Sequence, residues 1–211
     1  MSDLPQLREA VLSGDWKTAA AVTQAAIAAG TPPLAIVAGS LVPAMDEVGR
    51  LFECEEYFVP EMLLSARAMK ASMAIVRPLL VASGAQPIGR VVIGTVKGDL
   101  HDIGKNLVAA MLEGGGFEVI DLGADVSPER FIEAAATRNA NLVAISALLT
   151  VTMTSMKTTI DAFQAAGLRH TVKIMVGGAP VTQQYADSIG ADGYGESAGA
   201  AVALARKMVA A

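Results

Sequence analysis

Apolar residues in the first eighty positions recur every three or four residues, which is the spacing of one buried helix face. The clearest stripe runs from Leu34 to Phe52, with charged residues between its apolar members. Another helix is expected to open at Pro60, because proline is favoured at the first helical position. With two shorter helices expected at 7–12 and 16–29, the pattern predicts a four-helix bundle over residues 1–84.

After residue 90 the pattern changes to short apolar runs that alternate with helical stretches, which is typical of βαβ units around a buried parallel sheet. Strands are expected at 91–95, 118–122, 142–146, 173–176 and 193–195. Helices are expected at 105–113, 128–138, 153–166, 181–189 and 197–209. This order predicts a flavodoxin-like (Rossmann-like) five-stranded α/β domain over residues 90–211, joined to the all-α bundle by a linker at 83–89.

Composition excludes several partners and locations. The uncharged stretch 139–156 is rich in Asn, Ser and Thr, so no membrane-spanning segment is expected there. A net charge of −5 with 16 Lys and Arg residues gives no positive surplus for a phosphate backbone, so nucleic acid is not an expected partner. The amino terminus lacks a secretory pattern and Cys54 is the single cysteine, which favours a cytoplasmic protein.

The unusual residues of the second domain follow its strands. In a sheet of order 2-1-3-4-5, ligands bind outside the carboxyl ends of the strands, where the first and third strands part. The segments 98–106, 146–152 and 177–180 follow the first, third and fourth expected strands. Three loops that are distant in sequence are therefore expected to share one rim.

His101 is the candidate metal ligand of this rim. A ligating imidazole commonly donates its second N–H to a carboxylate, and Asp99 lies two residues before it. An alternative is that Asp99 and His101 only cap the helix that enters at Gly104. Zinc is disfavoured, because His170 and Cys54 lie in unrelated segments and zinc needs three or four protein ligands.

A family resemblance rests on three motifs in order. Asp99-x-His101-x-x-Gly104, then Ser146-x-Leu148, then Gly177-Gly178 resemble the signature of cobalamin-binding domains, including that of methionine synthase. The first half resembles the helical cap of corrinoid proteins of methyl-transfer systems, at Val48-Gly49-x-x-Phe52 and at 58–66. The resemblance implies a cobalamin whose dimethylbenzimidazole tail leaves cobalt, is replaced by a histidine, and is buried in a slot of the sheet domain.

The resemblance also implies residue roles. His101 matches the axial ligand of cobalt, Asp99 its hydrogen-bonding partner, and Gly104 the small residue that lets the tail pass. Thr152 falls where methionine synthase has a serine that extends the hydrogen-bonded chain from the histidine ligand through the carboxylate. The full set of implied cofactor contacts is Asp99, His101, Asp102, Ile103, Gly104, Ser146, Leu148, Thr150, Thr152, Gly177, Gly178 and Ala179, with Met62 and Leu63 from the cap. Two plainer readings stay open: an ordinary strand-to-helix turn at the Gly-Gly pair, and bundle core for the methionines.

The implied function is a methyl carrier, not catalytic alone, in which cobalt cycles between Co(I) and methyl-Co(III). The implied partners are a substrate-specific methyltransferase, an acceptor methyltransferase that uses a tetrahydrofolate or a thiol, and a reductive activase. A cobalamin-sensing regulatory module and a small subunit of an adenosylcobalamin mutase are the alternatives. The sequence identifies neither the methyl donor nor the acceptor.

Overall fold

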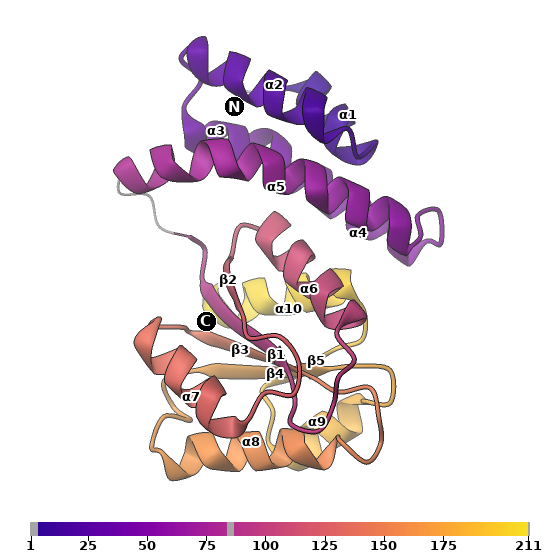
Figure 1. Ribbon diagram of the computed structural model, residues 1–211, viewed down its shortest axis with the longest axis vertical. Helices are drawn as coiled ribbons and strands as arrows, with labels where there is room; N and C mark the ends of the chain where they lie inside the picture. The colour runs from indigo at the N-terminus through magenta and orange to yellow at the C-terminus, as the bar shows by residue number, and fades with distance from the viewer. Residues whose placement is uncertain (1–3, 84–86, 211) are drawn as a thin grey trace. The chain divides into compact units, whose positions relative to one another are not determined.

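The computed structural model describes residues 4–83 and 87–210 (Figure 1). The chain divides into two compact units, one made of residues 1–87 with 113–116 and the other of residues 88–112 with 117–211. The domain limits expected from the sequence, 1–84 and 90–211, stay a prediction. Residues 84–86 of the expected linker, 83–89, lie outside the described residues.

The first unit is helical, as the three- and four-residue periodicity predicts. Asp15 begins the second helix by accepting hydrogen bonds from the amides of Lys17 and Thr18. The run from Pro33 to Glu53 is continuous and contains one π-helical turn, so residues 4–83 form four helical segments. The elements are α1 (Pro5–Leu12), α2 (Trp16–Ala28), α3 (Pro33–Ile36), the π-helix η1 (Val37–Leu41), α4 (Val42–Glu53) and α5 (Val59–Ala82).

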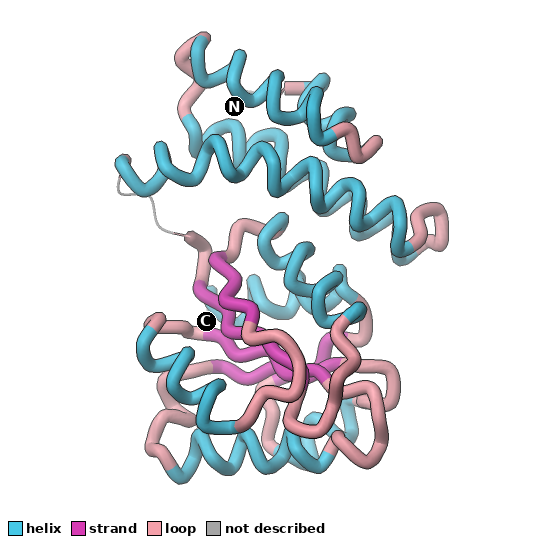
Figure 2. Tube along the Cα trace, in the orientation of Figure 1, coloured by secondary structure: helices cyan, strands magenta, loops and turns pink. Residues whose placement is uncertain are grey.

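The second unit is a five-stranded parallel sheet of order β2-β1-β3-β4-β5, which confirms the predicted fold class. The strands are β1 (Arg90–Thr95), β2 (Glu118–Asp121), β3 (Leu142–Ser146), β4 (Lys173–Gly177) and β5 (Gly193–Gly195). The helices are α6 (Ile103–Gly114), α7 (Pro128–Thr137), α8 (Thr154–Ala165), α9 (Gln183–Ile189) and α10 (Ala198–Ala210). The loops that leave the carboxyl ends of the strands gather at one edge (Figure 2).

The two faces of the sheet are covered differently. Helices α7, α8 and α9 lie on one face, and α6 and α10 lie on the other (Figure 1). Side chains alternate between the faces along each strand. Val143 and Ile145 point into the buried core beneath α7, α8 and α9, which also holds Phe131 and Phe163. Ala144, between them, therefore points toward the face beneath α6 and α10.

Among the helices of residues 4–83 and 87–210, none combines enough length with enough apolar character to span a lipid bilayer.

Two buried serines on one face of α5 differ in their hydrogen bonding. The Ser65 hydroxyl donates to the carbonyl of Leu12 at 3.0 Å, whereas the equally buried Ser72 hydroxyl has no partner among residues 4–83 and 87–210. We expect Ser65→Ala to lower the free energy of unfolding by about 1 kcal/mol, and Ser72→Ala to leave it unchanged or raise it by up to about 1 kcal/mol. Trp16, the single tryptophan and a member of this unit, reports urea unfolding by fluorescence. Equal losses in both variants would contradict the assignment.

Candidate functional site

His101 is held by hydrogen bonds on three sides in the loop between β1 and α6. Its backbone N–H donates to Asp99 Oδ1 at 3.0 Å, and its ring Nδ1 lies 2.7 Å from the same oxygen. Its carbonyl accepts from the hydroxyl of Thr95, the buried last residue of β1, at 2.9 Å. The His101 side chain keeps 49% of its surface exposed, whereas that of Asp99 is fully buried. The loop thus presents an imidazole at the carboxyl edge of the sheet.

The second oxygen of Asp99 binds the loop that follows β3. Oδ2 accepts from the Thr152 hydroxyl at 2.7 Å and from the Leu148 and Leu149 amides at 2.8 and 3.3 Å. Burial by itself raises the pKa of the Asp99 carboxyl, but the hydrogen bonds from Thr152, Leu148 and His101 outweigh it and hold this pKa well below its ordinary value. Asp99 is therefore ionised at neutral pH.

The ionised carboxylate decides the form of the imidazole. A carboxylate can only accept, so the proton of the neutral His101 ring lies on Nδ1, and Nε2 carries a lone pair. The carboxylate of Asp99 binds residues 101, 148, 149 and 152, none of them in the first turn of α6. There the amide of Asn106 bonds to the carbonyl of Asp102 at 2.7 Å. The geometry therefore favours the ligand-orienting interpretation of Asp99 over helix capping.

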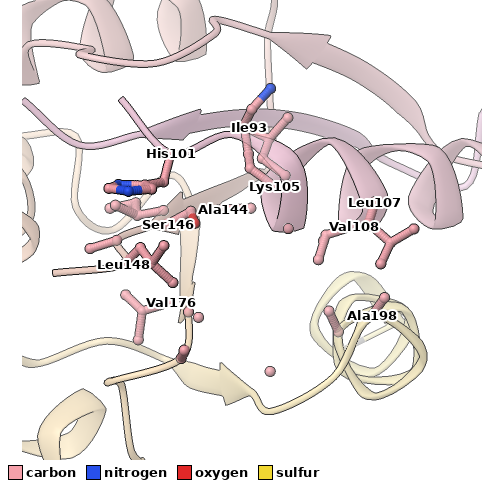
Figure 3. A pocket seen from close by; sticks show the side chains of 18 of the residues that line it. Ile93, His101, Lys105, Leu107, Val108, Ala144, Ser146, Leu148, Val176 and Ala198 are labelled. Atoms are coloured by element: carbon pink, nitrogen blue, oxygen red, sulfur yellow. The ribbon is translucent and has the colours of Figure 1, made fainter. Parts of the chain in front are cut away.

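A cavity of about 580 Å³ opens beside His101 on the sheet face covered by α6 and α10 (Figure 3). Its floor is made by Ile93, Ala144 and Met175, which are direct neighbours across β1, β3 and β4. Leu107 and Val108 of α6 and the small residues Ala198 and Ala201 of α10 form its deeper walls. The volume lies within the range of about 300–1,000 Å³ that is usual for sites enclosing a small molecule. We call this cavity the slot.

Three glycines shape the slot for different reasons. A Cβ on Gly104 would meet no atom within 4 Å, so Gly104 borders open space and a side chain there would enter it. Gly178 has φ +130°, and its Cβ would lie 1.9 Å from the carbonyl oxygen of Ala147. A Cβ on Gly177 would lie 3.0 Å from the carbonyl oxygen of Gly195. The Gly-Gly pair is thus required by close backbone contacts of the protein itself.

Large apolar side chains lie exposed around the same edge. Leu100 and Ile103, on either side of His101 in the chain, are 77% and 72% exposed, and Val151 in the loop after β3 is 75% exposed. Exposed apolar groups gathered at a pocket are typical of a binding surface. The edge therefore offers a flat apolar ligand both contact area and one nitrogen donor.

The donor set fits a metal that brings most of its own ligands. Within residues 4–83 and 87–210, no three His, Cys, Asp or Glu side chains come together to hold a metal ion. A bare transition metal takes several protein ligands, whereas the metal of a planar macrocycle needs only an axial one. One oriented imidazole above a slot therefore fits a corrinoid.

Most of the predicted contacts meet at the slot, and a few do not. Asp99 and Thr152 lie buried behind the imidazole. Thr150 is exposed and outside the slot lining. In the helical unit Met62 is fully buried and Leu63 is 46% exposed, and their cofactor roles stay predictions, as does that of Thr150. The predicted residues that line the slot are His101, Asp102, Ile103, Gly104, Ser146, Leu148, Gly177, Gly178 and Ala179.

Two supporting groups were not predicted from the sequence. Thr95, which binds the His101 carbonyl, is a polar residue at the end of an otherwise apolar run, and that was its only signal. Lys105 has a side chain only 1% exposed, and its ammonium binds the Asp121 carboxylate, at 2.6 Å to Oδ1, and the Asn106 side chain. This pair ties the first turn of α6 to the end of β2. No sequence pattern links positions 105 and 121.

Comparison with known families gives a consistent result. Residues 89–203 match a family described as the B12 binding domain, and residues 4–77 match a second family with the same description. A corrinoid protein of Desulfitobacterium hafniense strain Y51 is 40% identical over 99% of this chain and 98% of its own length. The dimethylamine corrinoid protein of Methanosarcina barkeri is 44% identical over 98% of this chain and 97% of its own length.

Solved structures agree. A cobalamin-binding protein of Desulfitobacterium hafniense DCB-2 superposes with a TM-score of 0.81 at 30% identity, covering 99% of both chains. A chain of the methanol:cobalamin methyltransferase complex of Methanosarcina barkeri gives a TM-score of 0.86 at 31% identity, covering 97% of this chain and 78% of that one. With matches over both units and an oriented histidine beside a slot, this chain belongs to the B12-binding corrinoid protein family.

Proposed function

We propose that this chain is the methyl-carrying corrinoid protein of a methyltransferase system, with His101 as the lower axial ligand. The observation that carries the proposal is the Asp99–His101 pair, which turns an imidazole with a lone pair on Nε2 toward solvent beside the slot. When bound, a corrinoid supplies a cobalt centre that takes up and gives up a methyl group. The protein holds that centre and controls access to it.

The residues of the sheet unit divide this work. Asp99 keeps the imidazole in one tautomer, and Thr152 keeps Asp99 ionised and fixed. The slot would hold the nucleotide tail of a corrinoid, which would leave the metal to the imidazole of His101. The exposed side chains of Leu100 and Ile103 would provide apolar contact to a bound corrinoid.

Relatives that match nearly the whole chain are named as corrinoid proteins of dimethylamine and trimethylamine, and a matching structure belongs to a methanol:cobalamin methyltransferase complex. These names favour a carrier over the mutase-subunit and sensor alternatives. They also support a substrate-specific methyltransferase as a partner. We further propose an acceptor methyltransferase that uses a tetrahydrofolate or a thiol, and a reductive activase. The methyl donor is then selected by the partner and not by this chain.

The ligand nitrogen can be identified by isotope labelling. Protein labelled with ¹⁵N is loaded with hydroxocobalamin and reduced by one electron to Co(II). We expect the splitting of its electron paramagnetic resonance signal to change from the triplet of ¹⁴N to the doublet of ¹⁵N, because the axial nitrogen comes from His101. In His101→Ala the isotope effect should disappear.

The chain contains its own control, since His170 is the other of its two histidines. His170→Ala should keep the doublet. A triplet in labelled wild-type protein would mean that cobalt retains the nitrogen of its own tail, and the proposal would be rejected.

A larger side chain on a strand of the sheet should fill the slot and exclude the nucleotide tail. Ala144→Leu places a larger apolar side chain on the slot floor, so we expect the affinity for hydroxocobalamin to fall more than about tenfold. Affinity for cobinamide, which lacks the nucleotide tail, should change less than about twofold. Both are measured by absorption titration. The unfolding midpoint should not fall, because the added group fills an apolar cavity. Equal losses for the two corrinoids would show that the tail lies elsewhere.

The hydroxyl of Thr152 should contribute more than an ordinary buried threonine hydroxyl, because its acceptor is charged. Thr152→Val is expected to lower the free energy of unfolding by about 2 kcal/mol, and Thr152→Ser to restore most of it. Thr159, whose hydroxyl is buried and donates to the neutral Ser155 carbonyl, provides the matched control, and Thr159→Val should cost about 1 kcal/mol. Urea unfolding followed by circular dichroism measures all three; a larger loss in Thr159→Val would refute the ranking.

A further inference from the structure

The loop between β1 and α6, residues 96–102, carries His101, and we call it the histidine loop. The segment that follows β2 continues alongside this loop beyond the ends of β1 and β2. The amide of Thr95 donates to the carbonyl of Gly123 at 3.0 Å, and the amide of Val126 donates to the carbonyl of Thr95 at 3.0 Å. A further parallel bridge joins Val96 to Val126. The ladder between β1 and β2 therefore reaches the base of the loop that carries His101.

Asp125, within this segment, binds three consecutive residues of the histidine loop. Its carboxylate accepts from the Gly98 amide at 2.8 Å and pairs with the Lys97 ammonium at 3.0 Å, while its own amide donates to the Asp99 carbonyl at 2.9 Å. The Gly98 amide and the Lys97 ammonium hold the pKa of the Asp125 carboxyl below its ordinary value. The carboxylate is therefore charged at neutral pH, and its two contacts are charge-assisted.

The backbone has a positive φ on both sides of this contact. Asp125 has φ +53°, in the left-handed region that few residues other than glycine enter. Gly98, its partner, has φ +87°. Aspartate and asparagine are the side chains that tolerate this region best, and non-glycine residues in it gather at functional sites. Here the conformation aims one carboxylate and one amide at the same short loop.

We infer that Asp125 is a positioning residue for His101, acting by clamping the loop of Lys97, Gly98 and Asp99 before the corrinoid enters. The inference rests on the proposed function of this site. Asp99 is fixed on one side by the loop after β3, through Thr152. Asp125 fixes the other side, where Gly98 would otherwise give the backbone its greatest freedom. With both sides held, the imidazole is already oriented and binding does not have to order it.

The clamp can be removed without straining the backbone. In Asp125→Gly the carboxylate is lost, but glycine accepts φ +53° at no steric cost, so the fold is retained. Asp125→Asn keeps an acceptor for Gly98 and a residue type that tolerates this conformation, and serves as the rescue variant. Asp161→Ala is the control, because it deletes an exposed aspartate of the same unit that pairs with Lys157 on α8.

Two readouts are measured. In the cofactor-free protein, hydrogen exchange of the Gly98 amide should accelerate at least about tenfold in Asp125→Gly. With hydroxocobalamin, the dissociation constant should rise about tenfold, and the fraction of Co(II) protein that shows a protein ¹⁵N ligand should fall. Asp125→Asn should recover most of both effects, and Asp161→Ala should match wild type.

The outcomes separate this inference from the function on which it rests. If wild-type protein binds hydroxocobalamin without a protein nitrogen on cobalt, the proposed function fails, whatever the variants do. If wild type shows the protein ligand and Asp125→Gly equals it in affinity and ligand fraction, the positioning role is overturned. The same holds if Gly98 exchanges faster while ligation is unchanged, because the clamp would then not act on His101.

Discussion

A single ionised carboxylate, buried out of water, holds the site together. Taking the charge of Asp99 into the protein costs several kcal/mol unless nearby groups replace its hydration. The replacement comes from the imidazole and amide of His101 on one side and from Thr152 and two backbone amides on the other. These donors belong to the loops after β1 and β3. Between these two neighbouring strands the order of strands along the sheet reverses direction. The charge therefore couples two loops whose residues lie about fifty positions apart in the chain.

The unequal faces of the sheet explain why the slot lies where it does. Beneath α7, α8 and α9 the core is filled by large side chains such as Phe131, Phe163 and Met156. Beneath α6 and α10 the central strand offers Ala144, and α10 offers Ala198 and Ala201. The same βαβ architecture thus has one face packed with large side chains and one face that leaves the slot open. The difference comes from residue size at a few positions.

Hydrophobic patterning predicts the sheet unit closely, because its buried strands are short apolar runs with clear ends. The strands at 142–146 and 193–195 have the predicted limits, and the order of the strands follows the rule for doubly wound sheets. Pattern is less informative in the helical unit, where α5 continues past Pro78 to Ala82 and the π-helical turn η1 leaves no sequence mark.

The sequence predicts only those site residues that belong to a recognisable local motif. His101 and Asp99 stand out because a histidine near a carboxylate in a glycine-flanked loop is a chemical pattern. The role of Thr152 came from family resemblance, since no periodicity links it to Asp99. Lys105 and Asp125 were missed because their partners lie sixteen and about twenty-seven positions away, where only the folded chain joins them.

The slot also affects the steady-state amount of intact protein in a cell. Its walls are mostly apolar, so a molecule that fills it supplies packing that the chain does not provide for itself on that face. Such a molecule binds the folded chain and not the unfolded one, and by mass action it lowers the population that proteases can attack. Vitamin scarcity would then reduce the amount of intact carrier as well as its loading, which ties protein turnover to nutrient supply.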